Sequence, residues 1–190
     1  MGGSLSKTKH RIAAIKGTEK TTKAMGLIAT VKSKRLRDAY DKSNLYLEEY
    51  LSLMAMLFAH DSETKTHYGE FNKEDLPDLY IVITSNMGLC GAYNSNIFKL
   101  ADSTIREKDY IIPIGNKAIH HYERSEKFKN ILTDFEMDVA DLDMSLLRKL
   151  CLELKDEFNK KKYRSIQIIY TKYVNTITFQ PDKFQFLPVQ

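Results

Sequence analysis

The chain has 190 residues, of which 43% are hydrophobic and 28% are charged. This length fits one domain with an appendage better than two full domains, and no apolar run reaches the roughly 18 residues that a membrane-spanning helix needs. Residues 1–43 carry 11 basic and 3 acidic side chains, a net charge of +8. The whole chain carries +4, so residues 44–190 sum to −4. A basic arm on a mildly acidic body predicts a polyanionic or acidic partner.

The first 60 residues predict one long helix that begins at Ser4 or Ser6 and runs to about His60. This stretch has no proline, and its apolar or small residues recur every three or four positions. A helix of about 50 residues is about 75 Å long, far beyond the usual globular helix, so it must pack on a partner. The stripe is thin in its middle, which predicts a closely approaching partner or a polar seam. The small or polar residues there are Thr18, Thr22, Gly26 and Ser33.

Two targeting signals are compatible with the N-terminus, and neither is favoured. The arm is basic, poor in acidic residues and amphipathic, as transit peptides are, but its pattern continues for more than 50 residues. Gly2 followed by Ser6 fits a loose myristoylation pattern. Residues 2–4, Gly-Gly-Ser, equally resemble a cloning scar.

The remainder predicts a polar linker, residues 61–78, followed by an α/β domain, residues 79–190. Short β-branched runs alternate there with amphipathic stretches, which favours a Rossmann-like, mainly parallel sheet flanked by helices on both faces. Pro113 predicts that its strand lies at an edge or bulge. The expected strands are 79–84, 110–114, 131–135, 165–170, 176–179 and 184–187, and the expected helices are 94–107, 116–124 and 143–160.

Residue patterns for catalysis or cofactors are weak. Gly88 and Gly91 lie between a strand and a helix, but their spacing matches no nucleotide-binding loop, so a tight turn is the simpler interpretation. Cys90 has no histidine nearby in sequence to act as a base, and Cys90 and Cys151 are expected to be free thiols. We therefore expect no catalytic residue, metal or cofactor. Asp138, Asp141 and Asp143 lack a complete calcium-loop pattern and are interpreted as helix-capping residues.

Nucleic-acid binding is the alternative explanation of the basic arm. Lysine-rich helices neutralise phosphates, and a protein of this class is one hypothesis for the chain. However, no aromatic residue that stacks on bases occurs between Leu5 and Ala39, and the lysines are spread along and around the helix. A surface that faces protein or solvent is the commoner outcome, so we expect no direct nucleic-acid contact. A small α/β enzyme that uses Cys90 is a third hypothesis.

Three motifs in this order resemble the gamma subunit of F-type ATP synthase. The family pattern I-x-x-T-x-K-I-T-K-A-M-x-M-V-A-x-x-K-x-x-R resembles residues 15–35. The pattern S-D-R-G-L-C-G-x-x-N resembles residues 85–94, and I-G-x-K-A resembles residues 114–118. Together they extend the resemblance over essentially the whole chain, which makes it far more specific than any one motif.

The resemblance implies a non-catalytic central rotor shaft, with catalysis in the beta subunits of a ring of alpha and beta subunits. The sheet domain is expected as the foot, near the epsilon subunit and the membrane rotor ring, in a peripheral membrane-associated complex on the cytoplasmic side in bacteria or, less favoured, the mitochondrial matrix side. A specialised F1-related motor that makes no ATP is an alternative. The implied interface residues are Lys20, Lys23, Met25, Lys34 and Arg35, and the implied structural motif residues are Gly88, Leu89, Cys90, Gly91 and Asn94.

Two departures from the family pattern stand out. The Asp-Arg pair before Gly-Leu-Cys-Gly is Asn86-Met87 here, so any ion pair of that dipeptide is absent. The family also has a long C-terminal helix that coils against the N-terminal one, and this sequence reaches Gln190 without it. The expectation is either a shortened chain or a divergent relative with a different axle.

Overall fold

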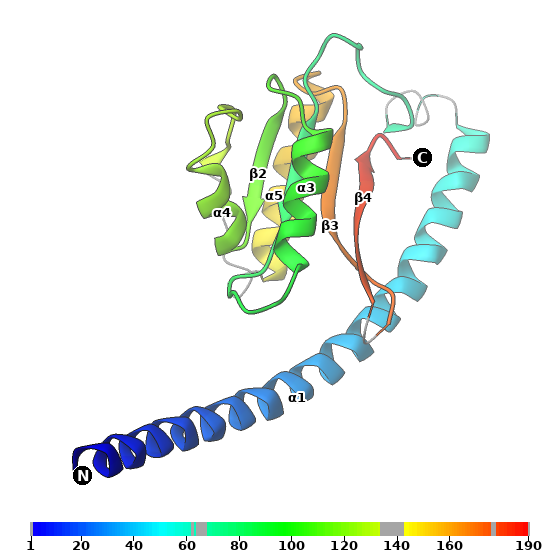
Figure 1. Ribbon diagram of the computed structural model, residues 1–190. Coiled ribbons are helices and arrows are strands. Elements are labelled where there is room, and N and C mark those ends of the chain that lie inside the picture. The colour runs from blue at the N-terminus through cyan, green and yellow to red at the C-terminus, as the bar shows by residue number, and fades with distance from the viewer. Residues whose placement is uncertain (1, 62, 64–67, 134–142, 176–177, 190) are drawn as a thin grey trace. The chain divides into compact units, whose positions relative to one another are not determined.

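The computed structural model describes residues 2–61, 63, 68–133, 143–175 and 178–189. The chain forms two compact units, Met1–Leu57 and Phe58–Gln190. The first consists of most of one long helix, and the second contains a β-sheet with its flanking helices (Figure 1). The combination of a long helix with an α/β unit agrees with the predicted fold class.

Helix α1, Gly2–His60, is a single uninterrupted helix of 59 residues (Figure 1). It starts before Ser4 and Ser6, so the prediction that one of them begins the helix was wrong. Every residue from Leu5 to Leu36 is exposed. None of the described helices combines the length and the apolar character that crossing a membrane requires. A water-exposed helix of this length draws little stability from packing in its own chain, which indicates a partner.

The sheet has four strands in the order β2-β1-β3-β4. Strand β1 pairs in parallel with β2 and β3, whereas β4 pairs antiparallel with β3. The sheet is therefore mainly parallel, as predicted, and β2 with its Pro113 lies at an edge of this order. The strands are β1, Leu79–Ile83; β2, Tyr110–Ile114; β3, Ile166–Tyr173; and β4, Phe179–Leu187.

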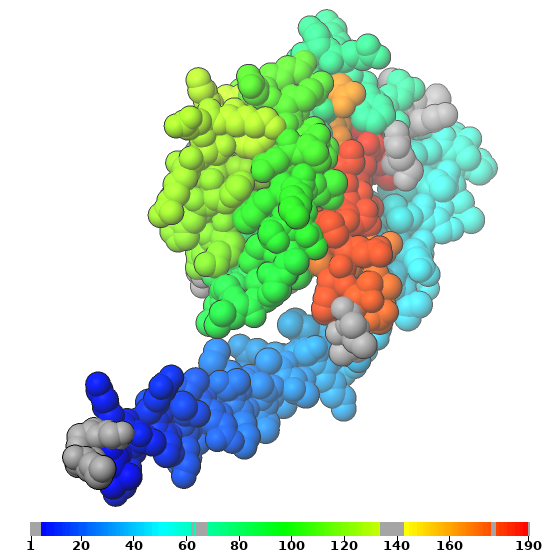
Figure 2. Space-filling model, in the orientation of Figure 1, coloured from blue at the N-terminus to red at the C-terminus, as the bar shows by residue number. Residues whose placement is uncertain are grey.

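Helices cover both faces of the sheet. Successive side chains of β1 point to opposite sides, so the strand contributes to a hydrophobic core on each face. Leu79 and Ile81 pack in one core with Leu150, Leu154 and Phe158 of helix α5. The alternate residues of β1 pack in a second core with helices α3 and α4, whose surfaces lie side by side in Figure 2. The helix bounds are α3, Tyr93–Thr104; α4, Asn116–Tyr122; and α5, Met144–Asn159.

Several element boundaries differ from the sequence-based expectation. The strand expected at 131–135 is reduced, within the described residues, to one parallel bridge between Ile131 and Ile111. Strand β3 continues to Tyr173 and β4 runs unbroken from Phe179, because the two pair along their length as an antiparallel hairpin. The side chain of Asp143 caps α5 by accepting a hydrogen bond from Leu146 N at 2.7 Å. Asp138 and Asp141 lie outside the described residues.

A buried ionic network ties the N-terminal ends of the parallel strands together. The carboxylate of Asp78 is 1% exposed and accepts hydrogen bonds from Arg106, Arg164 and Ser165 at 2.6–2.9 Å. The backbone N–H of Asp78 donates to Asp109 Oδ1 at 2.9 Å, and Asp109 is itself paired with Arg106. Asp78, Asp109 and Ser165 each directly precede a strand. The network therefore fixes where β1, β2 and β3 begin.

Three buried tyrosines make the free energy of unfolding of the sheet unit depend on pH in the alkaline range. Burial, assisted by the carboxylates of Asp78 and Asp109, raises the pKa of Tyr80 to about 12, and burial raises the pKa of Tyr163 to about 12. Burial also raises the pKa of Tyr122. Unfolded tyrosine ionises near pH 10, so this stabilisation is fully present below pH 10 and is lost as pH rises toward 12.

We expect the free energy of unfolding of the sheet unit to fall between pH 10 and pH 11.5, by up to about 2 kcal/mol per buried tyrosine, since each proton contributes about 1.4 kcal/mol per pH unit. Urea titrations followed by circular dichroism measure it. In Tyr122→Phe, which also removes a buried hydroxyl with no hydrogen-bond partner, this pH dependence is expected to be shallower. The control Tyr46→Phe changes a residue that is 72% exposed. Equal pH dependence in both variants would contradict the assignment.

Candidate subunit interface

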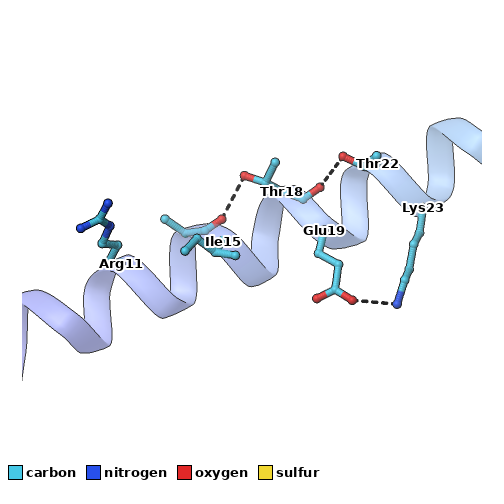
Figure 3. A pocket seen from close by; sticks show the side chains of 7 residues that line it. Arg11, Ile15, Thr18, Glu19, Thr22 and Lys23 are labelled. Atoms are coloured by element: carbon cyan, nitrogen blue, oxygen red, sulfur yellow. Dashed lines mark hydrogen bonds and ion pairs between the residues drawn. The ribbon is translucent and has the colours of Figure 1, made fainter.

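One face of α1 is rich in small and apolar residues and is exposed, although Arg11 also lies on it. We call the residues Ala14, Thr18, Thr22, Met25 and Ala29 the small-residue face; they follow one another at steps of three or four positions and so line one side of the helix. A shallow groove runs over the first part of it (Figure 3). The groove is lined by Arg11, Ala14, Ile15, Thr18, Glu19, Thr22 and Lys23.

The threonine hydroxyls of this face bond to the helix itself. Thr18 Oγ1 donates to Ala14 O at 3.1 Å, and Thr22 Oγ1 donates to Thr18 O at 2.9 Å (Figure 3). Thr30, which lies outside this face, makes the same bond to Gly26 O. Each hydroxyl is thereby satisfied within α1, so a partner meets this face without having to supply a hydrogen bond to these groups. If a polar seam forms here, as one of the two sequence-based expectations has it, its threonine hydroxyls already donate to carbonyls of α1.

The opposite side of α1 is basic. Residues two positions apart lie about 200° apart around a helix, and Lys16 and Lys20 each lie two positions from Thr18. We call the set Lys9, Lys16, Lys20, Lys23 and Lys34 the basic face, because its members are separated by three, four, seven or eleven positions. These five share one side, whereas Lys7 and Lys32 lie seven positions from Ala14 and Met25 and so fall on the opposite side. The lysines of the arm as a whole are therefore spread around the helix, as expected.

The five interface residues implied by the resemblance do not form one cluster. Lys20, Lys23 and Lys34 belong to the basic face, whereas Met25 belongs to the small-residue face. Arg35 lies between the two faces. Lys23 pairs with Glu19 at 2.7 Å, but this pair is exposed, so it holds the amine only weakly. The helix thus presents two different surfaces, one suited to acidic groups and one to close packing.

The Gly-Leu-Cys-Gly motif forms a tight turn at the C-terminal end of β1. Asn94 closes the turn from α3: its Oδ1 accepts from Ser85 N at 3.0 Å, and its Nδ2 donates to Ser85 Oγ at 2.8 Å. Gly91 has a φ of +59°, a conformation that glycine adopts without strain. Gly91 and Asn94 are therefore explained by the shape of the turn, whereas a Cβ atom at Gly88 would meet only the Lys117 side chain at 3.8 Å, an ordinary contact.

Leu89, at the tip of this turn, lowers the stability of the isolated chain in two ways. It has a φ of +62°, which strains a residue with a branched side chain, and it is fully exposed. Met87 beside it is 67% exposed. Strain combined with an exposed apolar side chain indicates a residue kept for an intermolecular contact.

The thiol of Cys90 lies within the same turn and accepts a hydrogen bond from Asn94 Nδ2 at 3.2 Å. Cys90 and Cys151 are both free. Within the part of the chain that the structure describes, no three histidine, cysteine or acidic side chains are grouped as metal ligands are. Histidines are not placed next to Cys90 by any described contact, so the arrangement does not support a thiol nucleophile with a base.

A second motif, residues 114–118, locks the end of β2 to the end of β1. The backbone N–H of Ala118 donates to Thr84 Oγ1 at 2.8 Å, and that of Asn116 donates to Asn86 Oδ1 at 3.3 Å. An amide oxygen at Asn86 thus accepts from the start of α4, as an aspartate oxygen would. Sequence reasoning missed this joint, although Gly115 in the motif was a signal for a close backbone approach.

Gly115→Ala is expected to destabilise the sheet unit by at least about 2 kcal/mol. Gly115 has a φ of +92°, and a Cβ atom there would lie 2.4 Å from Thr84 O. Chemical denaturation of the variant measures the loss. Gly17→Ala is the matched control, because a Cβ atom there meets nothing within 4 Å. Unchanged unfolding of the sheet unit in Gly115→Ala would refute the proposed joint.

The sequence is similar to known proteins over almost its whole length. Residues 4–190 match the family described as ATP synthase. The chain is 32% identical over 189 residues to the ATP synthase gamma chain of Mesoplasma florum, with 97% of this chain and 65% of the relative covered. It is 33% identical over 187 residues to the ATP synthase gamma chain of Mycoplasmopsis pulmonis, with 98% and 66% covered. The chain thus spans just under two thirds of the length of these relatives.

The fold is also similar to that of a solved structure. A chain in the cryo-EM structure of the central stalk and c-ring of the Tetrahymena thermophila mitochondrial ATP synthase superimposes with a TM-score of 0.51 at 18% identity. The match covers 71% of this chain and 59% of that chain. At this identity the likeness concerns the fold alone.

Proposed function

Because the chain belongs to the family of ATP synthase gamma chains, we propose that it is the central rotor shaft of an F1-type rotary ATPase. In this role it couples rotation to ATP synthesis or hydrolysis in a surrounding ring of alpha and beta subunits. The observation that carries the proposal is α1 itself, a helix of 59 residues whose residues 5–36 are all exposed. Such a helix is suited to transmit force only when other chains surround it.

The basic face is proposed to meet acidic loops of the beta subunits. Lys20, Lys23 and Lys34 point to one side of α1, and the isolated chain commits only Lys23 to a described ion pair. Charge of one sign along a rigid helix attracts a complementary acidic surface and disfavours a like-charged one. Rotation of the shaft then changes which beta subunit meets this face, and so shifts the population of its conformations.

The small-residue face is proposed to take a second helix of the shaft. Ala14, Thr18 and Thr22 allow two backbones to approach closely, as helices of a coiled coil do. Their hydroxyls already bond to the helix backbone. Met25 continues this face and is 51% exposed, so it is available to pack between the two helices.

The sheet unit is proposed as the foot of the shaft, against an epsilon subunit and the membrane rotor ring. The Asp78 network ties the N-terminal ends of β1, β2 and β3, and the Gly115 joint ties the C-terminal ends of β1 and β2. Strands fixed at both ends resist sliding past one another, as a foot that carries torque requires. Leu89 is proposed as a contact to a neighbouring subunit of the complex. Catalysis is assigned to the beta subunits, in a complex that is peripheral to the membrane.

Native mass spectrometry of the affinity-tagged chain, purified from its own cells, tests this assignment. We expect alpha and beta subunits in three copies each per copy of this chain, together with ATPase activity of the assembly. The proposal would be refuted if the chain purified alone from cells that contain alpha and beta subunits. Retention on DNA with a steep salt dependence would instead favour nucleic-acid binding.

A further inference from the structure

A basic pocket lies between α3 and α4 of the sheet unit, away from the helix α1 that carries the proposed function. Its volume of about 580 Å³ falls within the range of pockets that hold small ligands. We call it the basic pocket and define it by Asp102, Lys117, His120, His121, Arg124 and Lys127. Segments 93–104 and 116–128, which supply its walls, lie side by side in Figure 2.

The pocket is shaped by contacts that hold its walls in place. The ring of His121 stacks on Phe98 with centroids 3.9 Å apart and an interplanar angle of 11°. Lys127 Nζ donates to Asp102 O at 2.7 Å and lies 4.6 Å from the centre of the Phe128 ring. These contacts join the end of α3 to the segment after α4. The positive charge of Lys127 is therefore fixed at the pocket before any ligand arrives.

Two cations in the pocket are uncommitted. Among the described residues, neither Lys117 nor Arg124 has a side-chain hydrogen bond or ion pair, and both are exposed. Asp102 is the one carboxylate of the lining, and its Oδ1 lies 3.8 Å from His121 Nε2. With neutral histidines the lining carries three cations and one anion, a net +2. This charge is concentrated on a body, residues 44–190, that sums to −4.

We propose that the basic pocket binds a soluble anion with several phosphate-type oxygens, such as a diphosphate group. A planar guanidinium from Arg124 donates two parallel hydrogen bonds to such a group, and lysine amines match its charge as point donors. A monovalent anion satisfies only one of these cations. His120, whose Nδ1 is 3.2 Å from Glu123 Oε2, keeps Nε2 for a further contact at the mouth.

This proposal is independent of the role of α1 as a shaft. The pocket is open to solvent, and its walls are joined across α3, α4 and the segment after α4 by the Phe98–His121 stack and the Lys127–Asp102 hydrogen bond. This preset arrangement favours a small anion that several cations contact at once, and the experiment below separates it from a membrane surface. Inorganic pyrophosphate is therefore the probe. Because the lysines of α1 also attract anions, the readout must report position as well as affinity.

Amide chemical shifts of the full-length, isotope-labelled chain, followed during titration with pyrophosphate, give both quantities. We expect saturable shifts confined mainly to residues 117–128. The variant Lys117→Gln/Arg124→Gln is expected to weaken this binding by about tenfold or more, because it removes hydrogen bonds to charged groups. The matched control Arg148→Gln/Lys149→Gln changes the charge equally on α5, and should change the affinity by less than about twofold.

Three results would overturn the proposal. The first is shifts confined to α1, or the absence of saturable shifts in the sheet unit. The second is equal weakening in the pocket variant and the α5 control, which indicates a general charge effect. The third is sedimentation with phosphatidylglycerol vesicles that depends on Lys117 and Arg124, without a response to pyrophosphate, which indicates a membrane surface. Circular dichroism of both double variants confirms that they are folded.

Discussion

Asp78→Ala is expected to destabilise the sheet unit by about 3–5 kcal/mol, because it removes one partner from a buried ionic network. Asp78 is 1% exposed and accepts hydrogen bonds from both Arg106 and Arg164. Its loss leaves Arg164, 30% exposed, without its carboxylate, while Arg106 keeps Asp109. The cost is expected toward the lower end of the range because Arg164 still reaches water.

Urea denaturation followed by circular dichroism measures this loss. Asp78→Asn tests the charge separately from the shape, since an amide keeps most of the volume but cannot accept from two guanidinium groups as strongly. Asp75→Ala is a control at an exposed position three residues earlier. If Asp78→Ala and Asp75→Ala unfold at the same urea concentration, the network does not hold the strand ends together.

Reversing the basic face by Lys20→Glu, Lys23→Glu and Lys34→Glu is expected to impair coupling strongly and to weaken binding to the alpha–beta ring. If acidic loops of beta meet this face, the variant places like charges opposite one another, which costs several kcal/mol at an interface. The measurement is ATP-driven proton pumping by membranes that carry the variant, relative to the ATPase rate of the same membranes.

The sheet unit should remain folded in this triple variant, because all three lysines are exposed on α1. Reversal of Lys73, Lys99 and Lys183, exposed lysines of the sheet unit, is the control with the same change in net charge. Coupling that survives reversal of the basic face but fails in the control would remove the basic face from the proposed interface. Normal coupling in both variants would do the same.

The regular elements of the sheet unit were predictable from local pattern. The β-branched runs at Leu79–Ile83 and Tyr110–Ile114 and the apolar face of α5 are readable because strand and helix periods differ. Strand length at β3 was not predictable, because the extension to Tyr173 depends on pairing with β4. Ile131 has a strand-like neighbourhood in sequence but makes only one bridge.

The candidate site was only partly predictable. The motif resemblance identified Lys20, Lys23, Met25, Lys34 and Arg35 as one set, but the helix separates Met25 from the lysines. Their spacing already contained this signal. The Asp78 network could not be predicted from the sequence, because the partners of Asp78 lie 28 to 87 positions away and only the assembled sheet brings them together. The basic pocket likewise depends on α3 and α4 lying side by side.

Single-molecule rotation tests the central claim most directly. The complex is fixed through its alpha–beta ring, and a bead is attached through the exposed thiol of Cys151 in a Cys90→Ser background. The account predicts ATP-driven rotation in one direction, with three dwells per turn for a ring of three alpha–beta pairs. A bead that stays still on complexes that contain this chain and hydrolyse ATP would contradict it.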